Sequence, residues 1–275
     1  MRPPARARNR PWRSSMWSPL GKNIGGYKGE CIDIQSVLEE IQASAFRHQW
    51  KRDSFCLMPG VELIAYRRAV PNPRRRLYLS TGIHGDEPAG PLAIRELLRE
   101  DHWPKEIEVW LCPCLNLTGF PLNTRENARG IDLNRDYRHL SSEEIRTHVA
   151  WLQQQPNFDL AVSLHEDWES KGFYLYELNP DNRPSFAELI VQAVSEVCPI
   201  DTSSNIEGWV AKDGVIRPDK PPNERPQWPE TIYLINSNKT RQSYTLEAPS
   251  DFPIPVRVRA LETAVKTVLK LLAER

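Results

Sequence analysis

Two residues that can bind a metal ion lie three positions apart at the end of an apolar run. His84 and Glu87 follow residues 77–80, which are typical of a short buried strand. Pro88 opens a helical pattern over residues 88–98, and proline is tolerated in the first turn of a helix. The pattern therefore places His84 and Glu87 on a strand-to-helix loop, where ligands bind in open α/β sheets.

Two further polar residues follow predicted strands later in the chain. His165 comes after the apolar residues 159–164, and Glu247 comes after residues 243–246. We expect both to reach the sheet edge that carries His84 and Glu87. Two histidines and one glutamate make a three-ligand catalytic zinc site with an open position for water, whereas a structural site has four ligands. The remaining carboxylate can take a proton from the zinc-bound water as it attacks a carbonyl.

Each of these residues taken alone has an ordinary explanation. A His-x-x-Glu pair is usually accidental, a histidine after an apolar strand is more often a satisfied buried or edge group than a ligand, and Glu247 can be an ordinary acid at a strand end. A fourth segment favours the chemical interpretation. Residues 125–135 read RENARGIDLNR, and a plain solvated loop does not explain charge this dense around a glycine and an apolar pair.

Together these segments resemble the zinc carboxypeptidase family, the metallocarboxypeptidases of the carboxypeptidase A type. The matching elements, in family order, are HGDE at 84–87, NLTG at 116–119, residues 125–135, the apolar strand into His165, and YTLE at 244–247. The resemblance implies an α/β fold with one twisted, mixed and largely parallel sheet covered by helices on both faces. Residues 23–275 would form this single catalytic domain, and residues 1–22 would be a disordered Arg/Pro-rich tail.

The resemblance also implies the metal ligands and the base. His84, Glu87 and His165 would bind one Zn²⁺ per chain, which is the ligand set found in carboxypeptidase A. Glu247 would act as the general base and later as the proton donor.

By the same resemblance, four residues of the charged segment have roles around the substrate. Arg125 would polarise the scissile carbonyl and stabilise the developing oxyanion. Asn134 and Arg135 would hold the terminal carboxylate of the substrate, a task that suits a planar guanidinium. Asp132 would orient His84. The alternatives are a helix cap for Asp132 and surface salt bridges for both arginines.

Two enzymatic readings and one non-enzymatic reading follow. The first is a zinc metallocarboxypeptidase that hydrolyses an amide bond next to the free C-terminal carboxylate of a peptide, including a cell-wall-type peptide, because the chain also resembles the murein-peptide amidases of this family. The second is the aspartoacylase and succinylglutamate desuccinylase group, which acts on N-acyl amino acids and shares the His-Gly-x-Glu loop, the Asp-Leu-Asn-Arg element and the short ligand interval. The third, an inactive peptide- or metal-binding protein, requires a lost ligand or base, yet all four groups are present.

Substrate choice depends on residues that the motifs do not fix. The short interval between Glu87 and His165 predicts that specificity loops of the digestive enzymes are missing or rearranged. Glu166, Asp167 and Glu169 could favour a substrate amine or hold a second metal, although a solvated acidic loop is the simpler interpretation. Tyr233 is a candidate for the substrate-capping tyrosine, and a core position is at least as plausible.

Composition argues against nucleic-acid and membrane partners. The 275 residues include 36 basic and 36 acidic side chains, and the first fifteen carry five arginines and no acid, which leaves 31 basic residues in the rest. The start lacks the apolar core of a secretory signal, and no segment approaches a membrane span. We expect a cytoplasmic protein with Met1 or Met16 as its first residue, a transit peptide being the alternative. The sequence does not specify the oligomeric state.

The five cysteines do not describe a disulfide framework, because their number is odd in a chain of this length. Cys112 and Cys114 are too close for an ordinary zinc pair and are predicted to be core thiols. The remaining pattern alternates between helices and strands. Helices are expected at 34–45, 142–155, 185–197 and 256–273, strands at 61–67, 107–111 and 173–176, and a long surface loop at 213–229.

Overall fold

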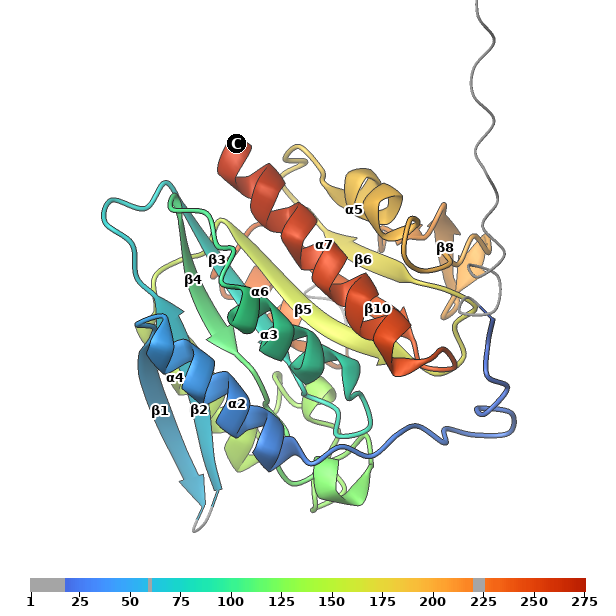
Figure 1. Cartoon of the computed structure of the whole chain (residues 1–275), viewed down its shortest axis with the longest axis horizontal. Coiled ribbons are helices and arrows are strands. Elements are labelled where there is room, and N and C mark those ends of the chain that lie inside the picture. The colour runs from blue at the N-terminus through green and yellow to red at the C-terminus, as the bar shows by residue number, and fades with distance from the viewer. Residues whose placement is uncertain (1–17, 59–60, 220–225) are drawn as a thin grey trace, which may run out of the picture.

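The computed structural model describes residues 18–58, 61–219 and 226–275 (Figure 1). Elements that carry the predicted strands and helices occur in the expected order. In chain order the helices and strands are α2 (Ile34–Arg47), β1 (Lys51–Met58), β2 (Val61–Arg68), β3 (Arg75–Thr81), α3 (Ala89–Glu100), β4 (Ile107–Cys112), the 3-10 helices η1 (Phe120–Leu122) and η2 (Leu133–Arg135), α4 (Glu143–Gln154), β5 (Leu160–Asp167), β6 (Tyr174–Leu178), α5 (Ala187–Val194), β7 (Asn205–Ile206), β8 (Trp209–Lys212), β9 (Val215–Ile216), α6 (Glu230–Asn236), β10 (Ser243–Pro249) and α7 (Ile254–Glu274).

Within the described residues, ten strands form one sheet in the order β1-β2-β4-β3-β5-β10-β6-β9-β8-β7. The four central strands β4, β3, β5 and β10 run parallel to one another, and β6 pairs in parallel with β9. The other five pairings are antiparallel. The predicted mixed α/β sheet is confirmed, but the sheet is not largely parallel, since its parallel pairings lie chiefly at the centre. The edge strands β1 and β7 to β9, which the sequence pattern did not predict, add antiparallel pairings.

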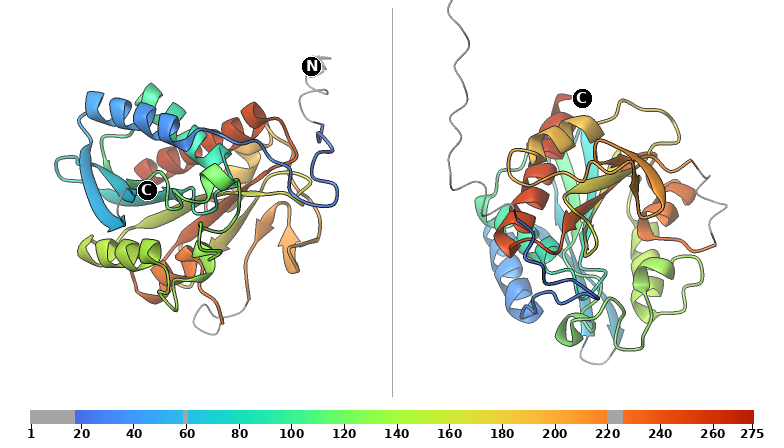
Figure 2. Two further views of the ribbon diagram at one scale, coloured as in Figure 1. Left: turned by 90° about the horizontal axis from the view of Figure 1, so that it is seen from below. Right: turned by 90° about the vertical axis from the view of Figure 1, so that its right-hand side faces the viewer.

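Helices cover both faces of this sheet, as predicted (Figure 2). The alternation of side chains along β3 shows how the two faces are filled. Leu77 and Leu79 belong to the apolar core beneath α2, α3, α5 and α7, whereas Tyr78 belongs to a second core beneath α4 and α6. The central strands are therefore buried on both faces. A functional site on these strands must lie at their ends.

A local signal accounts for the start of α4. The Ser142 hydroxyl accepts a hydrogen bond from the Ile145 N–H and caps α4, as the sequence predicts. Cys112 and Cys114 are buried free thiols, which confirms their core assignment. The predicted loop at 213–229 contains the short strand β9, and its residues 220–225 lie outside the described part of the chain.

The start of the chain is attached to the body before residue 23. The backbone N–H groups of Leu20, Gly21 and Lys22 donate to the carbonyl or the carboxylate of Asp251 at 2.6, 2.9 and 2.8 Å. Residues 1–17 of the predicted tail lie outside the described residues. No helix within the described ranges is long and apolar enough to cross a membrane.

Candidate active site

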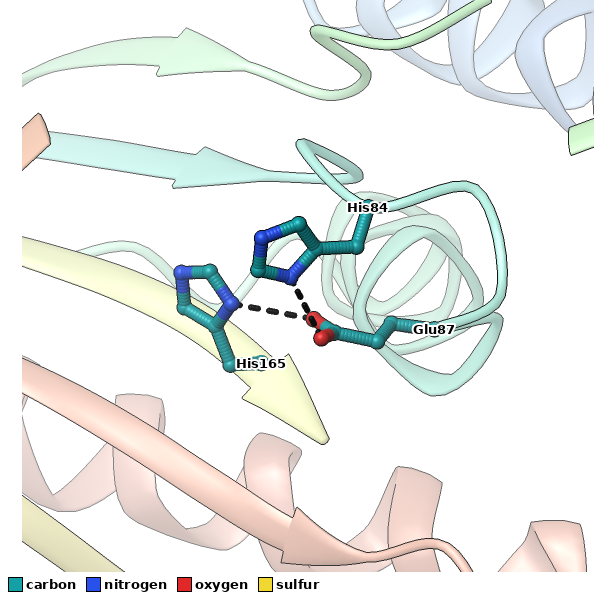
Figure 3. A group of neighbouring side chains, drawn as sticks. All are labelled: His84, Glu87 and His165. Atoms are coloured by element: carbon teal, nitrogen blue, oxygen red, sulfur yellow. Dashed lines mark hydrogen bonds and ion pairs between the residues drawn. The ribbon is translucent and has the colours of Figure 1, made fainter. Parts of the chain in front are cut away.

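Three predicted ligands meet at the carboxyl ends of β3 and β5 (Figure 3). His84 and Glu87 come from the β3–α3 loop, and His165 lies on β5. The His84 Nδ1 atom lies 2.5 Å from Glu87 Oε1, and the His165 Nδ1 atom lies 2.9 Å from Glu87 Oε2. All three residues are buried, with exposed fractions of 2, 6 and 3%. Burial opposes the charged form of Glu87, but the two imidazoles outweigh it and lower the pKa of this carboxyl overall.

The donor set fits a metal ion. One ligand atom from each of His84, Glu87 and His165 lies within 4.8 Å of the others, and both imidazoles present the same ring atom to one carboxylate. Two histidine nitrogens and a carboxylate are ligands that suit zinc. Among the described residues this is the one group of three or more potential ligands close enough to hold an ion.

Close backbone contact fixes the ligand loop against a neighbouring turn. A Cβ atom on Gly85 would lie 2.2 Å from the carbonyl carbon of Gly119, so a larger side chain would push the two segments apart. Gly119 belongs to the predicted NLTG element, where Asn116 Oδ1 accepts from the Gly119 N–H at 2.9 Å and Asn116 Nδ2 donates to the Arg125 carbonyl at 3.2 Å. This element therefore joins the ligand loop to the segment that carries Arg125.

Asp132 caps η2 and also lies close to His84. Its carboxylate caps η2 by accepting from the Asn134 N–H at 2.9 Å, and the same carboxylate lies 3.4 Å from His84 Nε2. The Arg125 Nε–H also donates to it at 2.8 Å. Asp132 thus lies behind His84, on the side of the ring opposite Glu87, and connects the metal site to Arg125.

The Arg125 guanidinium faces the ligand cluster, with Nη1 3.7 Å from Glu87 Oε1. Burial alone would lower the pKa of Arg125, but Glu87 and Asp132 raise it overall. The side chain is therefore a fixed positive charge beside the ligands. That position suits stabilisation of an oxyanion, and the side chain also forms a salt bridge with Asp132.

Glu247 lies beside His165 in the parallel register of β10 and β5. The cavity next to the ligands is lined by both residues. Burial, with the negative charges of Glu87 and Asp167, raises the pKa of Glu247 well above its usual range, although His165 opposes the shift. The structure therefore places this carboxyl next to the three ligands without making it part of their cluster.

The cavity has a volume of about 530 Å³. Asn134 and Arg135 line it together with the ligands, Arg125 and Glu247. Arg135 Nη1 donates to the Asn134 carbonyl at 2.9 Å, and no carboxylate of the described residues forms an ion pair with Arg135. The structure thus gathers all eight predicted site residues at one end of the sheet.

Several lining residues were not identified from the sequence. Tyr174, Tyr176 and Leu178 alternate along β6, so one face of this strand forms a wall of the cavity. Tyr233, the candidate capping residue, is not among the lining residues. It is buried and packs against Tyr137 in the second core, with ring centroids 5.6 Å apart. The alternation of tyrosines over residues 174–178 is the sequence signal that could have found this wall.

The three acids after His165 point in different directions. Asp167 and Glu169 line the cavity, and Asp167 accepts from the Tyr174 hydroxyl at 3.0 Å. Glu166 also lines the cavity, but its carboxylate accepts from the Ala89 N–H and from Arg257 Nη1, each at 2.5 Å. Because Glu166 is held by this cation, it is not available for the second metal that the sequence left open.

Comparison with known proteins finds similarity to metal-dependent hydrolases. A family model described as the succinylglutamate desuccinylase/aspartoacylase catalytic domain matches residues 73–203, and no curated protein matches the chain. A protein of Shewanella denitrificans OS217, provisionally named a metallopeptidase, has a TM-score of 0.76 and 22% identity, with 88% of this chain and 92% of that chain covered. A metallo-carboxypeptidase of Pseudomonas aeruginosa, solved with (2-guanidinoethylmercapto)succinic acid, has a TM-score of 0.68 and 17% identity, with 89% and 70% covered.

The chain has the fold of zinc carboxypeptidase-like proteins. The family model adds a match to the desuccinylase and aspartoacylase branch, and the solved structures show the fold. Together they support a hydrolase of this superfamily.

We expect the protein to contain about one tightly held zinc ion per chain, as three protein ligands imply. His165→Ala removes one buried ligand and should lose the ion, whereas His102→Ala changes a histidine that is largely exposed and should keep it. Metal analysis of the dialysed proteins measures both. Full zinc occupancy in His165→Ala would show that the ligand assignment is wrong.

Proposed function

We propose that the protein is a zinc-dependent metallocarboxypeptidase that hydrolyses an amide bond next to the free carboxylate of a short peptide. One observation carries the proposal. The His84, Glu87 and His165 cluster lines the same cavity of about 530 Å³ as the guanidinium groups of Arg125 and Arg135. A substrate can therefore place a carboxylate on a guanidinium while its amide carbonyl lies at the metal ligands.

Arg135 and Asn134 support recognition of a substrate carboxylate. A planar guanidinium binds a carboxylate through two parallel hydrogen bonds, and no carboxylate within the described ranges forms an ion pair with Arg135. Asn134 presents its amide from the same 3-10 helix and also lines the cavity. These two residues would therefore select the carboxylate end of the substrate for binding in the cavity.

Glu247 and Arg125 would carry the proton transfer and the developing charge. When bound, zinc supplies an acidified water and polarises the carbonyl. The raised pKa of Glu247 means that this carboxyl holds a proton more readily than an ordinary glutamate, which suits a base that later gives the proton to the leaving amine. Arg125 would stabilise the negative charge that forms on the carbonyl oxygen.

The second candidate is hydrolysis of N-acyl amino acids, which the family match over residues 73–203 favours. Both substrate classes contain an acylated amino acid with a free carboxylate, so the same residues can serve either reaction. The cavity volume of about 530 Å³ lies within the range of pockets that enclose drug-sized ligands, roughly 300–1,000 Å³. We favour a peptide because a small acyl group would leave much of this space unfilled.

Part of the cavity lining is acidic. Asp167, Glu169 and Glu207 line the cavity, as do Tyr174 and Tyr176. Burial, reinforced by neighbouring acids, raises the pKa of Asp167 and of Glu207. This acidic lining supports the earlier suggestion of a substrate amine, so the substrate set should contain both cationic and neutral peptides.

A side-by-side assay tests the proposal. Zinc-loaded protein is incubated with C-terminal dipeptides that end in lysine or in leucine, with a γ-glutamyl-diaminopimelate peptide, and with acetylaspartate and succinylglutamate. We expect cleavage of a peptide, loss of activity with a chelator and recovery with added zinc. Cleavage of the N-acyl amino acids alone would select the second candidate, and no cleavage of any substrate by the zinc-loaded protein would contradict both.

A further inference from the structure

A buried carboxylate that belongs to none of the predicted site residues lies beneath the cavity. Glu230, the first residue of α6, is 1% exposed. It accepts hydrogen bonds from the hydroxyl groups of Tyr78 at 2.6 Å, Ser80 at 2.5 Å and Ser163 at 2.8 Å. No lysine or arginine of the described residues forms an ion pair with it. Its buried oxygens therefore depend on hydroxyl donors from two neighbouring strands.

The donors of this network can be assigned along a chain of four residues. Because the Tyr78 hydroxyl donates to Glu230, it must accept at its oxygen, and the His148 Nε2 atom lies 2.9 Å away. The Nδ1 atom of the same ring then accepts from the Tyr137 hydroxyl at 2.8 Å. Burial lowers the pKa of His148 to about 4, which agrees with a neutral ring that donates from one nitrogen and accepts at the other. Each of these four residues therefore has a hydrogen-bond partner.

Glu230 also fixes the orientation of a predicted substrate-binding residue. Its backbone N–H donates to Asn134 Oδ1 at 3.0 Å. A backbone N–H can only donate, so the amide oxygen of Asn134 must face Glu230. The amide NH₂ is then left for the cavity, which Asn134 lines. The contact therefore presents the Asn134 NH₂ group, a hydrogen-bond donor, to the cavity. A substrate carboxylate accepts hydrogen bonds and requires such a donor.

The Glu230 side chain contacts both strands that lead to the proposed metal ligands, while its backbone contacts the Asn134 amide. Ser80 lies on β3, four residues before His84, and Ser163 lies on β5, two residues before His165. Residues next to Glu230 in the chain, Pro229 and Thr231, line the cavity. One carboxylate thus joins the ligand-bearing strands to the segment that orients Asn134.

We infer that Glu230 is a positioning residue for substrate binding. It holds the Asn134 amide in the donor orientation at a fixed place relative to His84 and His165, and it touches neither substrate nor metal. The inference rests on the proposed function, since it assumes that Asn134 binds a substrate carboxylate.

Glu230→Gln tests this role. The variant keeps the backbone N–H and the size of the side chain. It places an NH₂ group beside hydroxyl donors and so disturbs the hydrogen bonds that hold residue 230 in place. We expect KM for a cleaved peptide to rise about tenfold, the scale of one weakened hydrogen bond to a charged group, while kcat and zinc content change little. Glu177→Gln is a control for the loss of a buried carboxylate, because Glu177 is buried and accepts from hydroxyl groups and from Arg217 but does not contact Asn134.

A double-mutant comparison separates positioning from general loss of stability. In an Asn134→Ala background there is no amide to orient, so Glu230→Gln should have little further effect on KM. If Glu230→Gln does not fold, Ser163→Ala removes a single donor to Glu230 and should raise KM in the same direction. An unchanged KM in a folded variant, or an equal rise with and without Asn134, would overturn the inference.

Succinate binding distinguishes failure of this inference from failure of the proposed function. Calorimetry with succinate measures carboxylate binding by the zinc-loaded protein without any turnover. A wild-type protein that binds succinate but cleaves no peptide contradicts the proposed reaction alone. Weaker succinate binding by Glu230→Gln then still supports the positioning role, and equal binding overturns it.

Discussion

Glu247→Gln is expected to lower turnover by roughly a hundredfold or more, the scale of lost general-base catalysis, while the protein keeps its zinc. Glu247 reaches the site on β10 next to His165, and the ligand cluster is complete without it. Glutamine preserves the size of the side chain and removes the group that accepts the proton. Zinc content and steady-state turnover of the purified variant measure the two effects.

Glu87→Gln is the matched control for this experiment. Glu87 contacts both ligand histidines, so the same chemical change at this position should weaken metal affinity. An active Glu247→Gln protein, or one that has lost its zinc, would contradict the division of roles between the two glutamates.

The second large effect is on stability, at the buried ion pair behind the ligand loop. Arg257 and Glu166 have fully buried side chains, and their Nη1 and Oε2 atoms lie 2.5 Å apart. Arg257 also pairs with Glu30. Arg257→Met would leave Glu166 as an uncompensated charge in the core, and removal of one partner from a buried pair costs about 3–5 kcal/mol. Urea or guanidinium unfolding of the zinc-free protein measures this loss.

Two further variants test whether the unpaired charge of Glu166 causes the loss of stability in Arg257→Met. Arg257→Met combined with Glu166→Gln should recover part of the stability, because the unpaired charge is gone. Arg241→Met breaks an exposed pair with Asp181 and should change the unfolding midpoint little. If Arg257→Met is no less stable than Arg241→Met, the pair does not stabilise the fold.

Local sequence signals were sufficient for the part of the site that lies on regular elements. Residues 77–80 and Pro88 correctly bracket the loop that carries His84 and Glu87, because a buried strand and a helix start are both determined within a few residues. His165 and Glu247 lie on adjacent parallel strands as predicted, since apolar central strands of this kind meet at one edge. The residues 125–135 segment lies beside them.

Long-range pairing explains what the sequence analysis missed. Tyr174 and Tyr176 reach the cavity because β6 pairs with β10, and no local pattern specifies that partner. Glu230 is buried by contacts with Ser80 and Ser163, about 150 and 67 residues away in the chain. The pairing of Glu166 with Arg257 also depends on contacts between residues that are 91 positions apart.

That alternation makes β5 intolerant of insertions and deletions. His165 faces the metal site, and the next residue, Glu166, faces Arg257 on the opposite side of the sheet. A single residue added or removed within the strand would exchange the two faces, placing an imidazole beside the buried arginine and removing a ligand from the metal. Changes in chain length that preserve this arrangement must therefore lie outside β5, whereas substitutions within the strand leave its two faces unchanged.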